Sequence, residues 1–255
     1  EEIIKRLISL FIIHHPLFYD NDFLRLVDKE RIYMARRIKT SGGKSKTLPI
    51  KDEKLLKRVM DYLRFQAANA KTPIKKYQAD RNYMLFLIGF NTAFRAEDLL
   101  QLKVKDIEKG YVSIKENKTG KWQHFRMNKD LHNEIMQYVE KYKLNSNSYL
   151  FMGQKKKDTY NNVTKDVIYP ITRQNCRQTI FAKVIKACGI DFRFELHSLR
   201  KTFGYQFIKN GGKLVTLQRM YNHEDPSITM FYVMWDMNDV EEDRESIYIG
   251  GAKKR

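Results

Sequence analysis

Cysteine is nearly absent from this chain of 255 residues, which contains only Cys176 and Cys188. Two cysteines are too few for a disulfide framework or a zinc ribbon, and we expect both to be buried thiols. Long apolar runs are missing as well, since the longest one near the N-terminus, residues 10–13, is far too short to cross a bilayer. No signal-peptide cleavage pattern follows this run. We therefore expect a cytoplasmic protein with no membrane partner.

Acidic residues are scarce relative to basic ones. The chain has 30 Asp and Glu against 48 Lys and Arg, which gives a formal net charge of +18. Such an excess raises the local concentration of polyanions, and nucleic acid is the commonest of these partners. The alternative is a basic protein without a nucleic-acid partner. A hydrophobic content of 42% is sufficient for a sizeable core, so a folded chain is expected.

Three parts can be distinguished along the chain. Residues 1–38 have apolar positions at helical spacing, which predicts a short helical N-terminal segment. Residues 39–48 are small, polar and basic, as is typical of a linker. Residues 49–255 then form the main domain, which ends in a helix predicted over 237–249 and a basic tail.

The main domain is predicted to be mainly α with a small antiparallel β-sheet, an α+β fold. Period-two alternation on both sides of residues 117–120 predicts a hairpin, and Gly120 suits the positive φ that its turn requires. Residues 154–157 are interpreted as a basic loop. Apolar spacing and capping residues predict helices over residues 52–68, 78–90, 130–142, 173–187, 198–210 and 213–221.

The last third of the chain concentrates side chains that can surround a phosphodiester. His197 and Arg200 are three positions apart, which places them on one face of a helix. His223 precedes a helix that begins at Pro226, with an aspartate as its N-cap. Tyr232 follows His223 by nine residues and therefore lies near the end of that helix.

Phosphoryl transfer by a tyrosine requires cations on the non-bridging phosphate oxygens and a proton for the leaving oxygen. Two arginines can hold such oxygens in bidentate fashion, and Arg95, in a turn between two apolar helices, would be the second one. Lys118, in the hairpin turn, is a candidate proton donor. Taken alone, Arg95 could equally be a surface residue, and a lysine at a hairpin tip such as Lys118 is usually a solvated one. No acidic cluster suited to Mg²⁺ accompanies them in the sequence, which disfavours a two-metal nuclease.

Four short motifs follow one another in a fixed order. They are Arg95 within TAFRAEDL, Lys118 within NKTG, His197 and Arg200 within HSLR, and His223 with Tyr232 nine residues later. In this combination the chain resembles the tyrosine recombinase, or phage integrase, family over about residues 48–240. Ala93, Lys201 and the pair Tyr221-Asn222 depart from the family pattern, and the asparagine keeps a left-handed turn accessible.

The resemblance implies the chemistry of cleavage. Arg95 and Arg200 would hold the scissile phosphate, and Tyr232 would form a 3′-phosphotyrosyl bond. Lys118 would protonate the leaving 5′ oxygen, with Lys121 as a rival because the register of the hairpin is open by a few residues. The implied reaction is strand exchange through a Holliday junction, as in DNA integration and excision by mobile elements, with no metal, ATP or other cofactor.

The resemblance also implies supporting roles. His197 would orient the phosphate or act as acid or base, His223 would hydrogen-bond the phosphate, and Asp98 would support the surroundings of an arginine. The implied partner is double-stranded DNA, with four copies of the chain on two DNA sites. Residues 237–249 could dock on a neighbouring copy or pack on their own domain, and residues 1–38 would be a partial or minimal core-binding region. Basic candidates for DNA contacts are Lys44, Lys46, Lys155, Lys156, Lys157 and Lys201.

Other functions share many of these features. A type IB topoisomerase or a resolvase would use the same arginines, histidine and tyrosine, but a topoisomerase relaxes supercoils without pairing two sites. A catalytically silent DNA-binding accessory protein would keep the fold alone. The complete set of candidate residues argues against the silent protein.

Overall fold

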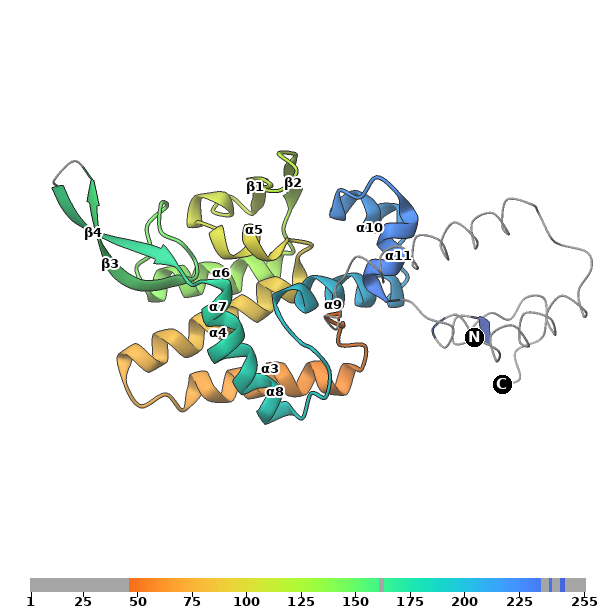
Figure 1. Ribbon diagram of the computed structural model, residues 1–255, viewed down its shortest axis with the longest axis horizontal. Helices are drawn as coiled ribbons and strands as arrows, with labels where there is room; N and C mark the ends of the chain where they lie inside the picture. Colours follow the sequence, from red (N-terminus) through yellow and green to blue (C-terminus); the bar gives the residue numbers. More distant parts are fainter. Residues whose placement is uncertain (1–45, 161–162, 235–238, 240–243, 246–255) are drawn as a thin grey trace, which may run out of the picture. The chain divides into compact units, whose positions relative to one another are not determined.

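The computed structural model describes residues 46–160, 163–234, 239 and 244–245 of the chain. The N-terminal segment, Lys44 and most of the linker lie outside the described residues, as does most of the helix expected over 237–249. Everything described belongs to the compact unit that begins at Lys46. Its elements are mainly helices with two small antiparallel sheets, which confirms the predicted fold class (Figure 1).

Two long helices open this unit, α3 (Glu53–Ala68) and α4 (Pro73–Asn91). α3 begins where the carboxylate of Asp52 accepts a hydrogen bond from the amide of Lys54 at 2.9 Å. Pro73 follows a threonine N-cap and occupies the first position of α4, where its missing amide proton costs no helical hydrogen bond. α4 therefore begins earlier than its apolar spacing predicts.

The middle of the unit contains the predicted hairpin between short helices. The elements are α5 (Ala96–Gln101), the 3₁₀ turn η1 (Val104–Asp106), β1 (Tyr111–Lys115), β2 (Trp122–Arg126) and α6 (Lys129–Lys141). Lys115 lies opposite Trp122, so residues 116–121 form the turn of the hairpin. Gly120 has a φ of 67° there, which confirms the turn position predicted for it.

A second two-stranded sheet, called the ribbon below, consists of β3 (Met152–Tyr160) and β4 (Val163–Pro170). It extends away from the helices (Figure 1). The predicted loop over residues 154–157 is wrong, because these residues lie within β3. They are exposed on both faces of the strand, so the sequence lacks the alternation of apolar and polar residues from which a strand can be predicted.

The final third is helical. α7 (Arg173–Asn175), the π-helical turn η2 (Cys176–Phe181) and α8 (Ala182–Cys188) follow one another without a break, and both cysteines are buried free thiols. Gly189 ends this segment in the left-handed region at a φ of 66°. The helices that follow are α9 (Leu196–Lys209), α10 (Leu214–Tyr221) and α11 (Pro226–Val233).

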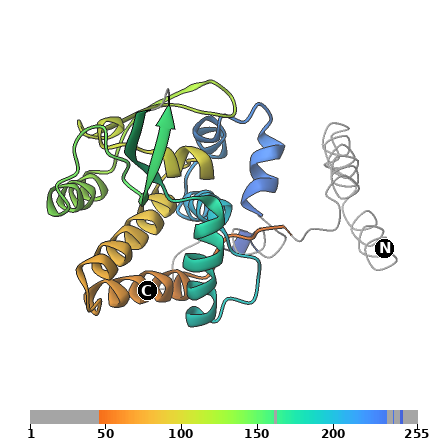
Figure 2. The same cartoon turned by 60° about the vertical axis from the view of Figure 1, so that its left-hand side comes forward.

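α9 connects the two parts of the core, since it packs against α4 and also against α10 and α11 (Figures 1 and 2). The larger apolar cluster extends from Ile50 to Leu199. The smaller one joins α9 to α10 and α11 through Tyr205, Leu217 and Val233. None of the described helices is both long enough and apolar enough to cross a membrane.

Candidate active site

Two arginines from distant parts of the sequence converge on one oxygen atom. Arg95 lies at the start of α5, and Arg200 lies in α9 with only 2% of its surface exposed. Each donates a hydrogen bond from Nη2 to the backbone carbonyl oxygen of Tyr221, at 3.3 Å for Arg95 and 3.0 Å for Arg200. Two guanidinium groups that reach one oxygen can also hold the oxygens of one phosphate.

Arg200 is more deeply buried than Arg95. Its Nη1 donates to the carbonyl oxygen of Ala93, and its guanidinium carbon lies 4.2 Å from the ring centroid of Tyr221. Burial lowers the pKa of Arg200 below its ordinary value, and its Nε is a buried atom without a hydrogen-bond partner. A buried cation whose neighbours here are mostly neutral is suited to an incoming anion.

Tyr221 also contacts the backbone of Arg200 through its side chain. Its hydroxyl donates to the carbonyl oxygen of Arg200 at 2.6 Å. The close approach requires glycine at position 204, because a Cβ atom there would lie 2.1 Å from the Tyr221 hydroxyl. The sequence singles out Tyr221 only as a departure from the family pattern, so its part in the site is missed there. A backbone acceptor has no signal in a sequence.

Tyr232 lies beside Arg200, and His223 lies beside Tyr232. The Tyr232 ring centroid is 5.6 Å from the Arg200 guanidinium carbon and 5.5 Å from the ring centroid of His223. His223 Nδ1 lies 3.0 Å from the hydroxyl oxygen of Thr229 in α11. Asn222, with φ 52° and ψ 37°, makes the left-handed turn between α10 and His223 that the sequence predicts for it.

His197 occupies the first turn of α9. Its Nε2 lies 3.3 Å from Nη2 of Arg173, a residue at the start of α7 that the sequence does not single out. Burial, followed by the charges of Arg173, Arg200 and Lys201, lowers the pKa of His197 to about 4. The imidazole is therefore neutral near pH 7, so it can accept a proton or donate one hydrogen bond.

The hairpin turn lies on the Arg95 side of the site. Glu116 is buried and forms an ion pair with Arg95. Lys118 is exposed and has no interaction with another described side chain. Lys121 forms a weak, exposed ion pair with Glu224 at 3.7 Å, next to His223. Both lysines therefore belong to the turn whose first residue, Glu116, contacts Arg95.

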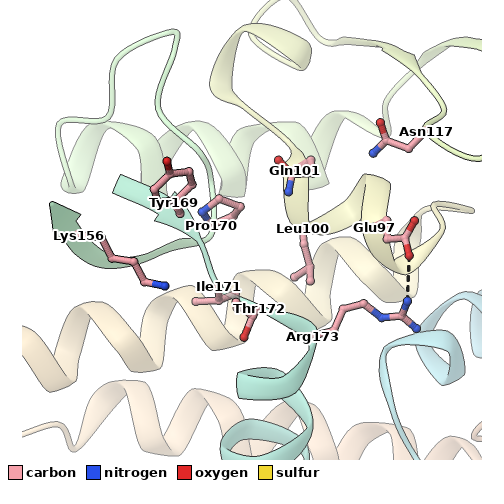
Figure 3. A pocket seen from close by; sticks show the side chains of 10 residues that line it. All are labelled: Glu97, Leu100, Gln101, Asn117, Lys156, Tyr169, Pro170, Ile171, Thr172 and Arg173. Carbon is pink, nitrogen blue, oxygen red and sulfur yellow. Dashed lines mark hydrogen bonds and ion pairs between the residues drawn. The ribbon is translucent and has the colours of Figure 1, made fainter. Parts of the chain in front are cut away.

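A polar cleft of about 790 Å³ adjoins the site between α5, the ribbon and α7 (Figure 3). Lys156 of β3 and Arg173 of α7 line it together with Gln101 and Asn117. Arg173 donates to Glu97 in α5 at 2.9 Å, so one arginine contacts both the cleft wall and His197. The exposed cations make the cleft suitable for an anionic ligand.

The lysines predicted as DNA contacts differ in their surroundings. Lys155, Lys156 and Lys157 are exposed on the ribbon, and Lys46 is partly buried. Lys201 differs from these lysines, because it is only 8% exposed and its Nζ donates to the carbonyl oxygen of Thr47 at 2.6 Å. Its position in α9, directly after Arg200, turns it toward the protein interior and within 5.4 Å of the Tyr232 ring centroid.

The structure therefore brings five of the predicted residues together and places Lys118 on the adjoining turn. The five are Arg95, His197, Arg200, His223 and Tyr232. Asp98 contacts the hairpin turn, because its carboxylate accepts a hydrogen bond from the amide of Asn117 at 2.9 Å. Among the described residues, no group of three or more His, Cys, Asp or Glu side chains is placed to hold a metal ion.

Comparison with known sequences gives consistent matches. The sequence model of the phage integrase family matches residues 60–239. The "Probable integrase/recombinase YoeC" of Bacillus subtilis is 35% identical over 164 residues, which cover 63% of this chain and 82% of YoeC. "Tyrosine recombinase XerA" of Pyrococcus furiosus is 24% identical over 60% of this chain, and the match spans about half of that protein (49%).

Solved structures share the fold. The crystal structure of XerA recombinase superposes with a TM-score of 0.56 at 17% identity, covering 82% of this chain and 68% of XerA. The XerH site-specific recombinase bound to its palindromic difH substrate gives a TM-score of 0.55 at 21% identity, covering 81% of this chain and 55% of XerH. At these identities the likeness concerns the fold alone.

Proposed function

This chain belongs to the phage integrase family, and we propose on that premise that it is a tyrosine-type site-specific recombinase that cuts and rejoins double-stranded DNA. The observation that carries the proposal is the convergence of Arg95 and Arg200 on one oxygen beside the ring of Tyr232. A phosphate oxygen can take the place of the Tyr221 carbonyl oxygen. We assign the chemistry to residues 49–255 and assistance in gripping DNA to residues 1–38.

The proposed cleavage step exchanges one phosphodiester for another. The Tyr232 phenol oxygen attacks the phosphorus atom, the bond to the 5′ oxygen breaks, and the 3′ phosphate becomes esterified to Tyr232. Negative charge develops on the non-bridging oxygens, where Arg95 and Arg200 stabilise it. The energy of the broken bond is kept in the phosphotyrosine, so another 5′ hydroxyl can reverse the step without a cofactor.

Protons must move in both directions during this step. Neutral His197 is suited to accept the proton of the phenol or to donate a hydrogen bond to the phosphate. His223, whose ring lies against that of Tyr232, would hydrogen-bond the phosphate. Lys118 would supply the proton to the 5′ oxygen, and its freedom from other side chains leaves it available for this contact.

DNA would lie across the polar cleft and the ribbon. Lys155, Lys156 and Lys157 project from an exposed strand, and Lys156 also lines the cleft. Lysines on a two-stranded ribbon can follow a phosphate backbone, a contact that positions DNA without specifying its sequence. The relative XerH is described in complex with its DNA substrate, which supports an interface of this kind.

We further propose that four copies assemble on two DNA sites and exchange strands through a Holliday junction. Residues 237–249 of each copy would dock on a neighbouring copy. An apolar cleft of about 460 Å³ between β2, α9 and α10 is a candidate acceptor, lined in part by Trp122, Phe125, Phe203 and Met220. The apolar residues Ile247 and Ile249 would enter it. Sedimentation on two-site DNA should then show loss of the tetramer in an Ile247→Asp variant; an unchanged tetramer would exclude this contact.

A trapped covalent adduct tests the function directly. A nicked suicide substrate that carries the cognate site prevents religation, so the protein should accumulate as an SDS-resistant complex with DNA. Tyr232→Phe should bind the same DNA and form no adduct. An adduct formed by this variant would exclude Tyr232 as the nucleophile, and no adduct from the wild-type chain on any candidate site would overturn the proposed activity.

A further inference from the structure

We infer that Glu116 is a positioning residue that ties the turn carrying Lys118 to Arg95, an inference that rests on the proposed recombinase function. Glu116 is the first residue of the turn, directly after β1 and two residues before Lys118, and none of the four sequence motifs includes it. Its side chain is completely shielded from solvent. A carboxylate in such a place requires partners that compensate for its lost hydration.

Glu116 has three such partners, each from a different part of the site. It forms the ion pair with Arg95, accepts a hydrogen bond from the Thr119 hydroxyl, and accepts another from the side-chain amide of Gln123 in β2. Burial opposes ionisation, but the bond from Thr119 and the charge of Arg95 hold the pKa of Glu116 below its ordinary value. One carboxylate thus links the phosphate-binding arginine to the residue directly after Lys118.

A second carboxylate holds the other side of the turn. Oδ1 of Asp98 accepts a hydrogen bond from the backbone amide of Asn117, the residue directly before Lys118, at 2.9 Å. Asp98 is buried and lies in α5, one helical turn after Arg95. Both neighbours of Lys118 are therefore attached to carboxylates that are themselves anchored beside Arg95.

These contacts explain how an exposed turn can hold Lys118 in a fixed position relative to the arginines. Residues 117–121 are exposed, and a two-stranded hairpin is marginal on its own, so the turn would move relative to the arginines without further contacts. A proton donor that is misplaced by about 1 Å can cost about 100-fold in rate. Glu116 and Asp98 restrict the turn so that Lys118 stays within reach of the phosphate that Arg95 holds.

An alternative role for Glu116, as a competitor of the phosphate for Arg95, makes a different prediction. If Glu116 merely occupied the place of the phosphate on Arg95, it would compete with substrate, and its removal would accelerate cleavage. The contacts to Thr119 and Gln123 favour positioning, because a competitor for the arginine needs no attachment to the turn.

The test uses the full chain and two suicide substrates that differ only in the leaving atom. One carries the normal 5′ oxygen and the other a 5′-bridging sulfur. Because a thiol has a pKa of about 8.5, the sulfur departs without a proton, and the lysine is not needed. Thr119→Val removes the bond to Glu116 at an exposed position, Thr119→Ser retains it, and Ser113→Ala in the same hairpin is the control.

Thr119→Val should slow adduct formation on the oxygen substrate by about 10- to 100-fold and restore the wild-type rate on the sulfur substrate. Thr119→Ser and Ser113→Ala should match the wild type on both. Glu116→Gln should be slow on both substrates and only partly rescued by sulfur, since it also weakens the support of Arg95.

Three results would overturn the inference while leaving the recombinase function intact. They are a Thr119→Val variant as fast as the wild type on oxygen, one equally slow on both substrates, and a Glu116→Gln variant faster than the wild type. If the wild-type chain forms no adduct on either substrate, the proposed function itself fails.

Discussion

The neutral state of His197 should make the protein sensitive to mild acid. In the folded chain the pKa of this imidazole is about 4, because burial and the nearby cations of Arg173 and Arg200 oppose its protonation. In the unfolded chain it should be near its usual value of about 6.5. Between these two values the unfolded state binds a proton that the folded state does not, so the free energy of unfolding falls as the pH falls.

The size of the effect follows from the two pKa values. Each pH unit below about 6.5 costs about 1.4 kcal/mol until the folded-state pKa is reached, so lowering the pH from 7.5 to 5 should remove about 2 kcal/mol of stability. Above pH 7.5 the contribution of His197 is constant. His197→Gln retains a polar side chain of similar reach but cannot titrate in this range.

Urea denaturation of the wild type and of His197→Gln between pH 5 and pH 7.5 measures this loss of stability. Other groups titrate equally in the two chains, so subtracting the curves isolates His197 and should give the slope stated above. His124→Gln, which removes an imidazole from the exposed face of β2, is the matched control. Parallel curves for the wild type and His197→Gln would refute the view that His197 is held neutral by its surroundings.

DNA should change this titration. A phosphate beside His197 favours the charged imidazole and should raise its pKa, so binding below about pH 6 should be accompanied by proton uptake. Calorimetry in two buffers of different ionisation enthalpy measures the number of protons taken up. His197→Gln should abolish the uptake, and equal uptake by both proteins would place the phosphate away from His197.

Three further predictions concern other parts of the molecule. Lys118→Ala should be slow on the oxygen substrate and rescued by the 5′ sulfur; a rescued defect in Lys121→Ala instead would transfer the role to that residue. Gly204→Ala should cost about 1–3 kcal/mol in urea denaturation, because the new methyl group meets the Tyr221 hydroxyl, and a neutral result would contradict the tight packing. Replacing the three lysines at 155–157 by alanine should reduce the slope of log Kd against log salt by up to about 3, while an unchanged slope would remove the ribbon from the DNA interface.

Local signals in the sequence predict the local parts of the structure. Asp225 caps α11 by accepting a hydrogen bond from the amide of Ser227, Gly120 takes the left-handed position of the hairpin turn, and Asn222 takes that of the turn before His223. These predictions succeed because each depends on backbone preferences within a few residues. The order of the motifs predicts the family for the same reason, since it requires no knowledge of the contacts between them.

The contacts that complete the site could not be predicted in this way. Arg173 and His197 are 24 positions apart, and Glu116 meets Arg95 only because the hairpin folds back onto α5. A strand such as β3, which buries neither face at residues 154–157, has no apolar alternation to mark it. The charge of Lys201 suggests a DNA contact, whereas in the structure this residue is buried in α9, and a sequence gives no sign of such burial.

In the proposed recombinase, the carbonyl oxygen of Tyr221 would occupy the position of a phosphate oxygen of the substrate. It holds both guanidinium groups close together without neutralising them, since a peptide dipole carries no net charge. The arginines are therefore preorganised before DNA arrives, and little of the binding energy is spent on bringing two like charges together. An anion forms stronger, charge-assisted hydrogen bonds with two guanidinium groups than a neutral carbonyl oxygen does, so a phosphodiester could replace it. For the proposed function, this arrangement would keep the two arginines together before DNA binds.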